Sequence, residues 1–177
     1  MKRIAILGST GSIGQSALSV VASFRDRLRV VGLAAGRNVE RFIAQIQQFK
    51  PAIVSLADEE AANCLQASGA SRHAVTVHGE DGLTAVATHP DVDLVLCASS
   101  GTTALAATLA AIEAGKTIAL ANKEALVMAG SVMIQAARRR NVTILPVDSE
   151  HNAIHQCVER RPEDVVRYIL TASGGPF

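Results

Sequence analysis

Near its start the chain passes from a short apolar run into three evenly spaced glycines. Residues 4–7 are apolar, residues 8–14 read GSTGSIG, and apolar side chains then recur at helical spacing. This order predicts a strand, a tight turn and the first turn of a helix, which together open a βαβ unit. Glycines let the backbone approach a ligand closely, and the free amides of a first helical turn attract anions. The stretch therefore favours a phosphate cradle, to which Thr10 and Ser12 would add hydroxyl donors.

The glycine spacing restricts the ligand only in part. It is G-x-x-G-x-x-G, whereas the usual NAD fingerprint is G-x-G-x-x-G, and such glycines can also serve strand-to-helix geometry alone. The Lys-Ser/Thr ending of a nucleotide triphosphate loop does not occur, since Gln15 and Ser16 follow Gly14. The position of the loop at the opening of a βαβ unit favours a dinucleotide cofactor over the purely structural interpretation.

The end of the next expected strand, residues 30–34, bears on which dinucleotide binds. An NAD enzyme places an acidic residue there to bind the ribose 2′-hydroxyl, but residues 35–38 read Ala-Gly-Arg-Asn. The planar guanidinium of Arg37 would suit a 2′-phosphate, and no acid is present to repel one. This predicts NADP(H). In the alternative interpretation, Arg37 is a solvated loop residue and Asn38 only caps the following helix.

Composition indicates an α/β fold. Of the 177 residues 49% are hydrophobic and only 3% are aromatic, so the core must be built from Ala, Val, Ile and Leu. This is typical of parallel sheets covered on both faces. The length allows one domain, or one domain and the start of another. We therefore expect a Rossmann-like, doubly wound, mostly parallel sheet.

Charge and cysteine usage argue against several function classes. A net charge of +1 gives no reason to expect nucleic acid or a membrane surface as a partner. Residues 1–3 lead into the first strand without a cleavable signal, and no apolar stretch is long enough to span a bilayer, so we expect a cytoplasmic protein. Cys64, Cys97 and Cys157 are scattered and odd in number, which favours reduced thiols over disulfides or a zinc site.

Strand and helix patterns alternate along the rest of the chain. Apolar spacing and turn residues predict helices over residues 39–49, 58–67, 80–88, 105–114 and 124–140, and strands over 52–56, 74–77, 94–97, 117–121, 142–147 and 165–171. Asp58 is expected to cap one helix and Gly115 to close another. The small, hydroxyl-rich loop at residues 98–103 either makes room for a cofactor or is an ordinary turn.

Three polar residues, Asn122, Lys123 and Glu124, follow the expected strand at residues 117–121. They would lie at the ligand-binding edge of the sheet, where Lys123 could neutralise an anionic substrate or orient a hydroxyl. Asn122 and Glu124 carry groups suited to the nicotinamide ribose. Alternatively, Asn122 caps the next helix and Glu124 favours its positive end.

Two carboxylates follow the next expected strand, residues 142–147. Asp148 and Glu150 are two residues apart, so both would point to one side of an extended segment. Oxygen ligands that converge in this way suit Mg²⁺ or Mn²⁺. His151 and His155 are one helical turn apart, but no third ligand of that type follows at a useful spacing, which disfavours zinc.

After the expected strand at residues 165–171, the chain ends in a glycine-rich stretch that contains Ser173. Such a loop suits another phosphate. A domain does not normally end on an open glycine loop, so we expect this sequence to be a fragment.

Four sequence blocks resemble one enzyme family in the family's own order. They are GSTGSIG at residues 8–14, LANKEALV at 120–127, PVDSEHNAI at 146–154 and TASGGPF at 171–177. The chain is thereby similar to the amino-terminal part of the 1-deoxy-D-xylulose 5-phosphate reductoisomerases of non-mevalonate isoprenoid biosynthesis. The resemblance implies an NADPH-binding domain over residues 1–147 and the truncated beginning of a catalytic domain over residues 148–177.

The resemblance also implies roles for particular residues. The NADPH-binding residues would be Thr10, Gly11, Ser12, Ile13, Gly36, Arg37, Asn38, Asn122 and Glu124. The substrate would contact Lys123, Ser149, Glu150 and Ser173, with Lys123 and Glu150 as catalytic residues. Asp148 and Glu150 would hold Mg²⁺ or Mn²⁺, with Co²⁺ also possible. His155 and the loop at residues 99–103 depart from the expected family form, so no contact is assigned to that loop.

The implied reaction rearranges a ketose phosphate to an aldehyde, which NADPH then reduces to 2-C-methyl-D-erythritol 4-phosphate. Family members are homodimers of more than twice this length, and a further metal-binding glutamate, a lid histidine and most phosphate ligands would follow residue 177. We therefore expect these 177 residues to bind NADPH without turnover.

Two other functions remain open from the residues alone. A short-chain dehydrogenase needs Tyr-x-x-x-Lys, but the single tyrosine, Tyr168, has Ala172 four positions later. A semialdehyde-type dehydrogenase would be another NADP-dependent oxidoreductase. A non-catalytic NADP-sensing module would have no need for the pair formed by Asp148 and Glu150.

Overall fold

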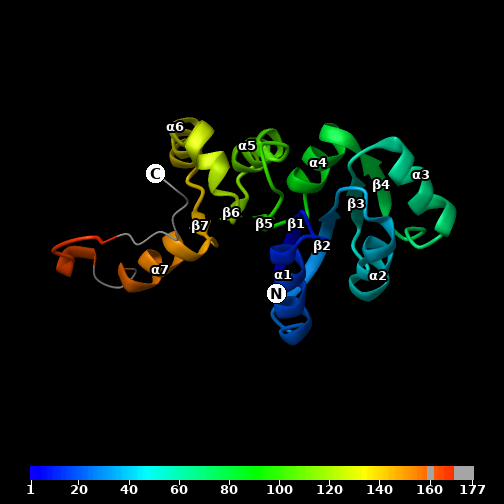
Figure 1. The fold of residues 1–177 in the computed structure, drawn as a ribbon, viewed down its shortest axis with the longest axis horizontal. Coiled ribbons are helices and arrows are strands. Elements are labelled where there is room, and N and C mark those ends of the chain that lie inside the picture. Colours follow the sequence, from blue (N-terminus) through cyan, green and yellow to red (C-terminus); the bar gives the residue numbers. More distant parts are fainter. Residues whose placement is uncertain (159–161, 170–177) are drawn as a thin grey trace, which may run out of the picture.

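Seven parallel strands form one sheet in the order β4-β3-β2-β1-β5-β6-β7 (Figure 1). The computed structural model describes residues 1–158 and 162–169 of the chain. The strands are β1 (Lys2–Leu7), β2 (Leu28–Ala34), β3 (Ile53–Leu56), β4 (Val75–His78), β5 (Leu94–Cys97), β6 (Thr117–Leu120) and β7 (Ile144–Pro146). The expected Rossmann-like α/β fold is confirmed.

Helices cover both faces of this sheet (Figure 1). One face carries α1 (Ser12–Ser23), α2 (Val39–Phe49) and α3 (Glu59–Ser68), and the other carries α4 (Gly79–Thr88), α5 (Leu105–Glu113) and α6 (Lys123–Arg140). The first face has a core around Phe42 and Ile46 of α2, and the second has a core around Ile112 and Met133. The inner strands β3, β2, β1, β5 and β6 are therefore mostly buried between two apolar layers, which explains their largely apolar sequences, whereas the edge strand β4 is partly exposed.

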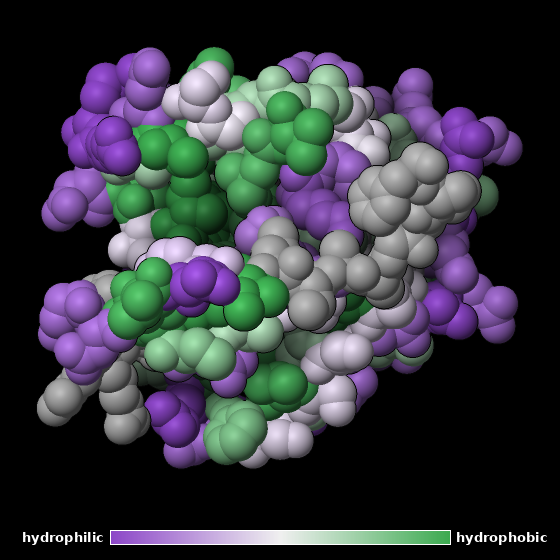
Figure 2. Space-filling view, turned by 60° about the vertical axis from the view of Figure 1, so that its left-hand side comes forward, coloured by the Kyte–Doolittle hydropathy of each residue, from purple (hydrophilic) through white to green (hydrophobic). Residues whose placement is uncertain are grey.

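At one end of the molecule, α7 (Ser149–Val158) follows β7 and extends away from the sheet (Figure 1). None of the described residues of α7 is buried, and the 3₁₀ turn η1 (Pro162–Asp164) follows it. Hydrophobic side chains gather at the surface in the view turned toward this end (Figure 2), and the exposed ones of α6 include Val127, Met128 and Val132. No described helix is both long and apolar enough to cross a membrane.

The structure confirms most of the expected elements with boundaries shifted by a few residues. Asp58 caps α3 by accepting a hydrogen bond from the amide of Ala61 at 3.0 Å, and Gly115 adopts φ +74° beyond α5. The expected strand at residues 165–171 is wrong for its described part, because residues 165–169 have no regular structure. Val166 and Ile169 are 100% and 75% exposed, so these apolar side chains do not pack in a sheet.

The cysteines are free thiols, as the sequence predicts. Cys64 on α3 and Cys157 on α7 are exposed, whereas Cys97 on β5 is buried. The sulfur of Cys97 lies 3.1 Å from the hydroxyl oxygen of Thr108, and burial raises the pKa of this thiol to about 11. Cys97 therefore stays protonated at neutral pH and acts as a core residue.

An ion pair between Arg3 and Asp93 joins the beginnings of β1 and β5. The Asp93 carboxylate accepts hydrogen bonds from the guanidinium of Arg3 at 2.8 and 3.2 Å and from the amide of Arg3 at 2.8 Å. The side-chain hydrogen bond from Arg3 is the largest of the effects that lower the pKa of Asp93 to about 2. The pair therefore stabilises the central strand pairing only while Asp93 is ionised.

We predict that this pair makes stability depend on acid pH. Because the folded pKa lies below the ordinary value of 3.8, the contribution is present near neutral pH and is lost as pH falls from about 4 to about 2. Asp93→Asn should lower the free energy of unfolding at pH 7 by about 1.5 kcal/mol. This loss is smaller than the pKa shift alone implies, because both side chains are partly exposed to solvent. Urea unfolding at pH 7, 4 and 2.5 measures this.

The matched control is Asp91→Asn, which removes a more exposed carboxylate that meets the same Arg3. It should change the free energy of unfolding by less than about 0.5 kcal/mol. An Asp93→Asn protein whose stability at pH 7 equals that of the wild type would contradict the prediction.

Candidate functional site

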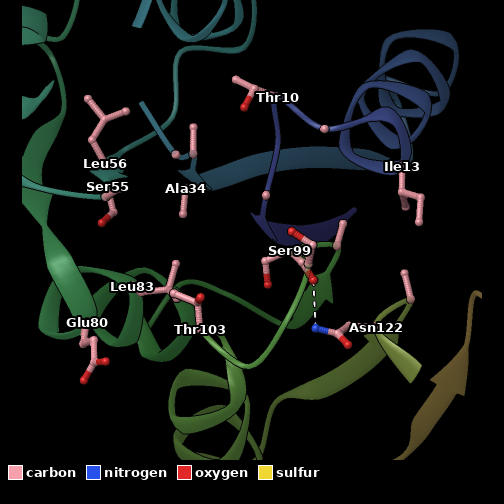
Figure 3. Close-up of a pocket in the computed structure, with 18 of the residues that line it drawn as sticks. Thr10, Ile13, Ala34, Ser55, Leu56, Glu80, Leu83, Ser99, Thr103 and Asn122 are labelled. Atoms are coloured by element: carbon pink, nitrogen blue, oxygen red, sulfur yellow. Dashed lines mark hydrogen bonds between the residues drawn. The ribbon is translucent and has the colours of Figure 1, made fainter. Parts of the chain in front are cut away.

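A cavity of about 860 Å³ opens at the carboxyl-terminal edge of the sheet (Figure 3). It is lined by the loops that follow β1, β2, β3, β5 and β6 and by the beginning of α4. We call this cavity the cleft. It lies at β1 and β5, where the strand order reverses direction, and open parallel sheets bind ligands at such a point. The lining residues are Gly8, Thr10, Gly11, Ser12, Ile13, Ala34, Ala35, Gly36, Ser55, Leu56, Ala57, Gly79, Glu80, Leu83, Ala98, Ser99, Ser100, Thr103, Ala121, Asn122 and Glu124.

Close backbone contacts shape the glycine-rich loop, residues 8–14. Gly8 has φ +91°, and a Cβ on it would stand 2.7 Å from the amide nitrogen of Ser99. A Cβ on Gly14 would stand 2.3 Å from the carbonyl oxygen of Gly8. Both distances are far below van der Waals contact, so only glycine fits at these two positions. The loop after β1 is thus packed by its backbone against both the loop after β5 and the first turn of α1.

The first turn of α1 lines the cleft and has no side-chain cap from its N-cap residue. Its N-cap residue is Gly11, whereas Asn38 and Asp58 cap α2 and α3 with their side chains. The amides of a first helical turn have no partner within the helix, and they carry the positive end of the helix dipole. The turn that contains Ser12 and Ile13 can therefore bind an anionic group.

The residues proposed for NADP selectivity lie at the rim of this region. Gly36 lines the cleft, whereas Arg37 and Asn38 do not. The Nε of Arg37 donates to Asp58 at 2.5 Å, and the Arg37 side chain is 82% exposed. The side chain of Asn38 accepts a hydrogen bond from the amide of Arg41 at 3.1 Å and caps α2. The capping interpretation of Asn38 is confirmed, and the contact of Arg37 with a 2′-phosphate stays a prediction.

Asn122 and Ser99 form the part of the cleft wall between β5 and β6 (Figure 3). The Nδ2 of Asn122 donates to the carbonyl oxygens of Ser99 at 2.8 Å and Gly101 at 2.6 Å. Its Oδ1 accepts from the amide of Ala125 at 3.3 Å, so the predicted cap of α6 is confirmed. Because both amide hydrogens are used within the protein, Asn122 can meet a ligand only as an acceptor.

The hydroxyl of Ser99 is buried and has no hydrogen-bond partner among the described residues. A buried polar group without a partner is unfavourable, and a ligand or a water molecule commonly satisfies it. The loop at residues 98–103 contributes Ala98, Ser99, Ser100 and Thr103 to the cleft. The loop therefore lines the cleft, and the interpretation that it makes room for a cofactor stays a prediction.

A second group of predicted residues lies beyond the cleft lining, after β6 and β7. The hydroxyl of Ser149 donates to the carboxylate of Glu150 at 2.8 Å. This hydrogen bond lowers the pKa of Glu150 below its ordinary value, assisted by the backbone amide of Glu150 and by the charge of Lys123. The nearby carboxylate of Asp148 acts in the opposite direction. The structure thus brings Lys123, Asp148, Ser149 and Glu150 into one electrostatic group.

The expectation that Asp148 and Glu150 lie on one side of an extended segment is wrong. Asp148 lies in a bend and Glu150 in the first turn of α7, where residues two apart diverge around the axis. The Oδ1 of Asp148 accepts from the amide of His151 at 3.1 Å and lies 2.8 Å from its Nδ1. The carboxylate therefore caps the helix, and the capping preference overrides strand alternation here.

These carboxylates fit a divalent cation only as part of its ligand set. Asp148 and Glu150 offer oxygen donors of the kind that Mg²⁺ prefers. The described residues contain no group of three His, Cys, Asp or Glu side chains placed to hold a metal ion. The Nδ1 of His151 lies 2.8 Å from the Oδ1 of Asp148, which leaves its Nε2 outside this contact. Ser173, the remaining residue predicted to bind substrate, lies outside the described residues.

Sequence patterns missed several residues of the cleft. Ser55, Leu56 and Ala57 follow β3, and Glu80 and Leu83 belong to α4. These residues are not part of a motif. The sequence predicts the end of β3 near residue 56. Because neighbouring parallel strands end at the same sheet edge, the residues after β3 could have been expected to lie next to those after β2. The approach of α4 to this edge depends on tertiary packing.

We predict that Gly14 and Gly36 differ sharply in their tolerance of alanine. Gly14→Ala would place a methyl group 2.3 Å from a backbone oxygen and should lower the free energy of unfolding by about 3 kcal/mol. Gly36 also lines the cleft, but a Cβ there meets nothing within 4 Å, so Gly36→Ala should change stability by less than about 0.5 kcal/mol. Thermal and urea unfolding of both variants test this; equal stability of the two would contradict it.

Two family profiles match the chain. The profile of 1-deoxy-D-xylulose 5-phosphate reductoisomerase matches residues 4–130, and the profile of that family's C-terminal domain matches residues 144–177. Proteins named 1-deoxy-D-xylulose 5-phosphate reductoisomerase from Anaeromyxobacter dehalogenans and Heliobacterium modesticaldum are 55% and 53% identical to it. Both matches cover 100% of this chain but only 45% and 46% of those proteins. The chain thus spans about half the length of the curated relatives it matches.

Solved structures agree with these matches. The 1-deoxy-D-xylulose 5-phosphate reductoisomerase of Zymomonas mobilis in complex with NADPH superimposes with a TM-score of 0.83 at 42% identity, over 88% of this chain and 41% of that one. A DOX-P reductoisomerase in complex with NADPH, fosmidomycin and magnesium gives 0.83 at 39% identity, over 89% and 39%. A biliverdin reductase from Synechocystis, at 21% identity and a TM-score of 0.53, shares only the fold.

Proposed function

Because the chain belongs to the 1-deoxy-D-xylulose 5-phosphate reductoisomerase family, we propose that it is the NADPH-binding part of such an enzyme. The full-length protein would convert 1-deoxy-D-xylulose 5-phosphate to 2-C-methyl-D-erythritol 4-phosphate in non-mevalonate isoprenoid biosynthesis. The cleft is the observation that carries this proposal, since a glycine-rich loop and an uncapped helix start meet there at the reversal of strand order. Two of the similar solved structures hold NADPH.

In this proposal the cofactor extends along the sheet edge. Thr10, Gly11, Ser12 and Ile13 would hold its diphosphate, because their turn presents amides and hydroxyls to the cleft. Gly36, Arg37 and Asn38 would hold the adenosine end with its 2′-phosphate. Asn122 and Glu124 would hold the nicotinamide ribose, and Asn122 would do so as an acceptor from a ribose hydroxyl.

The substrate would bind next to the nicotinamide end. Lys123, Ser149 and Glu150 form one electrostatic group after β6 and β7, and all parallel strands deliver their carboxyl ends to the same edge as the glycine-rich loop. Two strand spacings separate β5 from β7, which corresponds to roughly 10 Å. Lys123 would stabilise the substrate oxygen that gains negative charge, and Ser173 would bind the substrate as well.

Asp148 and Glu150 would supply two oxygen ligands to a divalent metal ion. Magnesium is present in similar structures, and we propose that Mn²⁺ and Co²⁺ are also accepted. A bound ion would act as a Lewis acid and a template for the sugar phosphate. The described chain would bind and orient the reactants around it, while further ligands come from other residues of the full-length protein.

The chain would supply the cofactor-binding residues of this enzyme and part of its substrate-binding residues. It spans 45% of the relative from Anaeromyxobacter dehalogenans, so we assign NADPH binding to it and turnover to the full-length protein. We further propose that the full-length protein is a cytoplasmic homodimer, as the family resemblance implies.

Arg37 should decide between NADPH and NADH in the full-length protein. Arg37→Glu replaces the guanidinium proposed for the 2′-phosphate by a repelling carboxylate, so KM for NADPH should rise by a factor of about 30 or more. KM for NADH, which has no 2′-phosphate, should change less than about threefold. Steady-state kinetics with both cofactors measure the ratio.

Two further variants control this test. Arg37→Met avoids placing a carboxylate next to Asp58 and should show the same bias with a smaller magnitude. Arg25→Glu makes the same charge change in the exposed loop between α1 and β2 and should leave both KM values unchanged. An equal loss for NADPH and NADH in Arg37→Glu would remove the assignment of the 2′-phosphate to this residue.

Metal binding distinguishes an enzyme from a non-catalytic NADP sensor. In the full-length protein, Asp148→Asn should weaken Mn²⁺ binding by a factor of about ten or more, because it removes one charged ligand and keeps a side chain that can cap α7. Asp26→Asn, in the exposed loop after α1, is the matched control. Calorimetric titration with Mn²⁺ gives both affinities, and equal affinity in the wild type and Asp148→Asn would favour the sensor.

A further inference from the structure

A buried polar residue of α2, Gln45, holds the glycine-rich loop from outside the cleft. Gln45 is 7% exposed, and Ser9 in the loop is fully buried. The Ser9 hydroxyl donates to the Oε1 of Gln45 at 2.7 Å, and the Nε2 of Gln45 donates to the carbonyl oxygen of Ser9 at 2.8 Å. The Gln45 side chain thus pairs reciprocally with the hydroxyl and the backbone carbonyl of Ser9, and we call this pair between α2 and the loop the Gln45–Ser9 clamp.

The position of Gln45 on the helix shows that packing alone does not account for it. Phe42 and Ile46 on the same helix are fully buried in the core of that face. An apolar side chain at position 45 would join this core without any cost of burying an amide. A buried glutamine is tolerated there because Ser9 satisfies both ends of its amide group. A buried position of α2 is thus occupied by a polar residue that hydrogen-bonds the loop.

The Gln45–Ser9 clamp fixes the direction of a peptide group next to the cradle. In a trans peptide the N–H of a residue points opposite to the preceding carbonyl. Because α2 holds the carbonyl of Ser9, the amide of Thr10 points away from α2. The carbonyl of Thr10 is also engaged, by the guanidinium of Arg41 at 3.3 Å and the side chain of Gln15 at 3.0 Å.

These contacts matter for an anionic ligand. A carbonyl oxygen that turned into the cradle would repel a phosphate and would remove an amide donor from it. Glycine residues have few steric restrictions on their backbone angles, so without these hydrogen bonds the peptide groups of the loop could rotate. The amide of Ser9 is held as well, by the carbonyl of Ala34 at 2.8 Å. The loop is therefore preorganised by hydrogen bonds as well as by close packing.

We propose that Gln45 is a positioning residue for the cofactor, which keeps the carbonyls of the glycine-rich loop out of the phosphate cradle through the Gln45–Ser9 clamp. This inference rests on the proposed NADPH-binding function. Gln45 does not line the cleft, and it acts on the cofactor only through Ser9.

The test uses the full-length enzyme and the variant Gln45→Met, which keeps the length and helix propensity of the side chain and removes both hydrogen bonds. The dissociation constant for NADPH, measured by fluorescence titration, should rise about tenfold, equivalent to about 1.4 kcal/mol. KM for NADPH should rise with it, whereas KM for the sugar phosphate should change less than twofold. Gln47→Met, at an exposed position of the same helix, is the matched control and should bind NADPH as the wild type does.

A second variant keeps the test decisive if Gln45→Met does not fold. Ser9→Ala removes only the hydroxyl and leaves the bond from Gln45 to the Ser9 carbonyl, so its dissociation constant should rise by a smaller factor, about threefold. Where both variants fold, the double variant should bind NADPH no more weakly than Gln45→Met, because both changes remove the same interaction.

The possible failures are distinguishable. If Gln45→Met and Ser9→Ala bind NADPH with wild-type affinity, the positioning role is overturned, even if melting temperatures fall. Loss of affinity for NADPH and sugar phosphate alike would also overturn it, since that result indicates general destabilisation. A wild-type protein that does not bind NADPH would instead reject the proposed function itself, and the inference with it.

Discussion

Backbone-to-backbone contact between two loops is the constraint on which the site depends. The loop after β1 approaches the loop after β5 so closely that Gly8 has no room for a Cβ atom, and Gly14 has none because the carbonyl oxygen of Gly8 in its own loop lies against it. These contacts hold β1, α1 and the loop after β5 together at the point where the strand order reverses. The cleft can therefore exist only if β1 and β5 pair in register, and the ion pair of Arg3 and Asp93 secures that pairing from the opposite end of the strands.

Features that depend on local sequence were predictable. Buried parallel strands read as apolar runs, so the alternating α/β architecture followed from periodicity. The caps formed by Asn38, Asp58 and Asn122 followed from the residue type that precedes each helix. The same local argument did not reveal that the amide of Asn122 also reaches Ser99 and Gly101, because that contact joins two crossovers. Long-range contacts of this kind also explain why Ser55 and Leu83 were missed.

The incorrect predictions have a common physical origin. A spacing of two residues has opposite meanings in a strand and in a helix, and the assignment of Asp148 and Glu150 to an extended segment ignored the capping ability of Asp148. Apolar character likewise predicted a strand at residues 165–171, although no described strand pairs with its described part, residues 165–169. Local sequence patterns predicted extended strands in both segments. A strand forms only where the tertiary structure supplies a neighbouring strand to pair with.

The distribution of thiols gives the molecule two natural attachment points. Cys97 is shielded in the sheet and remains protonated, so alkylating dyes should react first with Cys64 and Cys157. These two residues lie on α3 and α7, at opposite ends of the molecule (Figure 1). A donor and an acceptor fluorophore placed there would report, by energy transfer, any movement of α7 relative to the sheet.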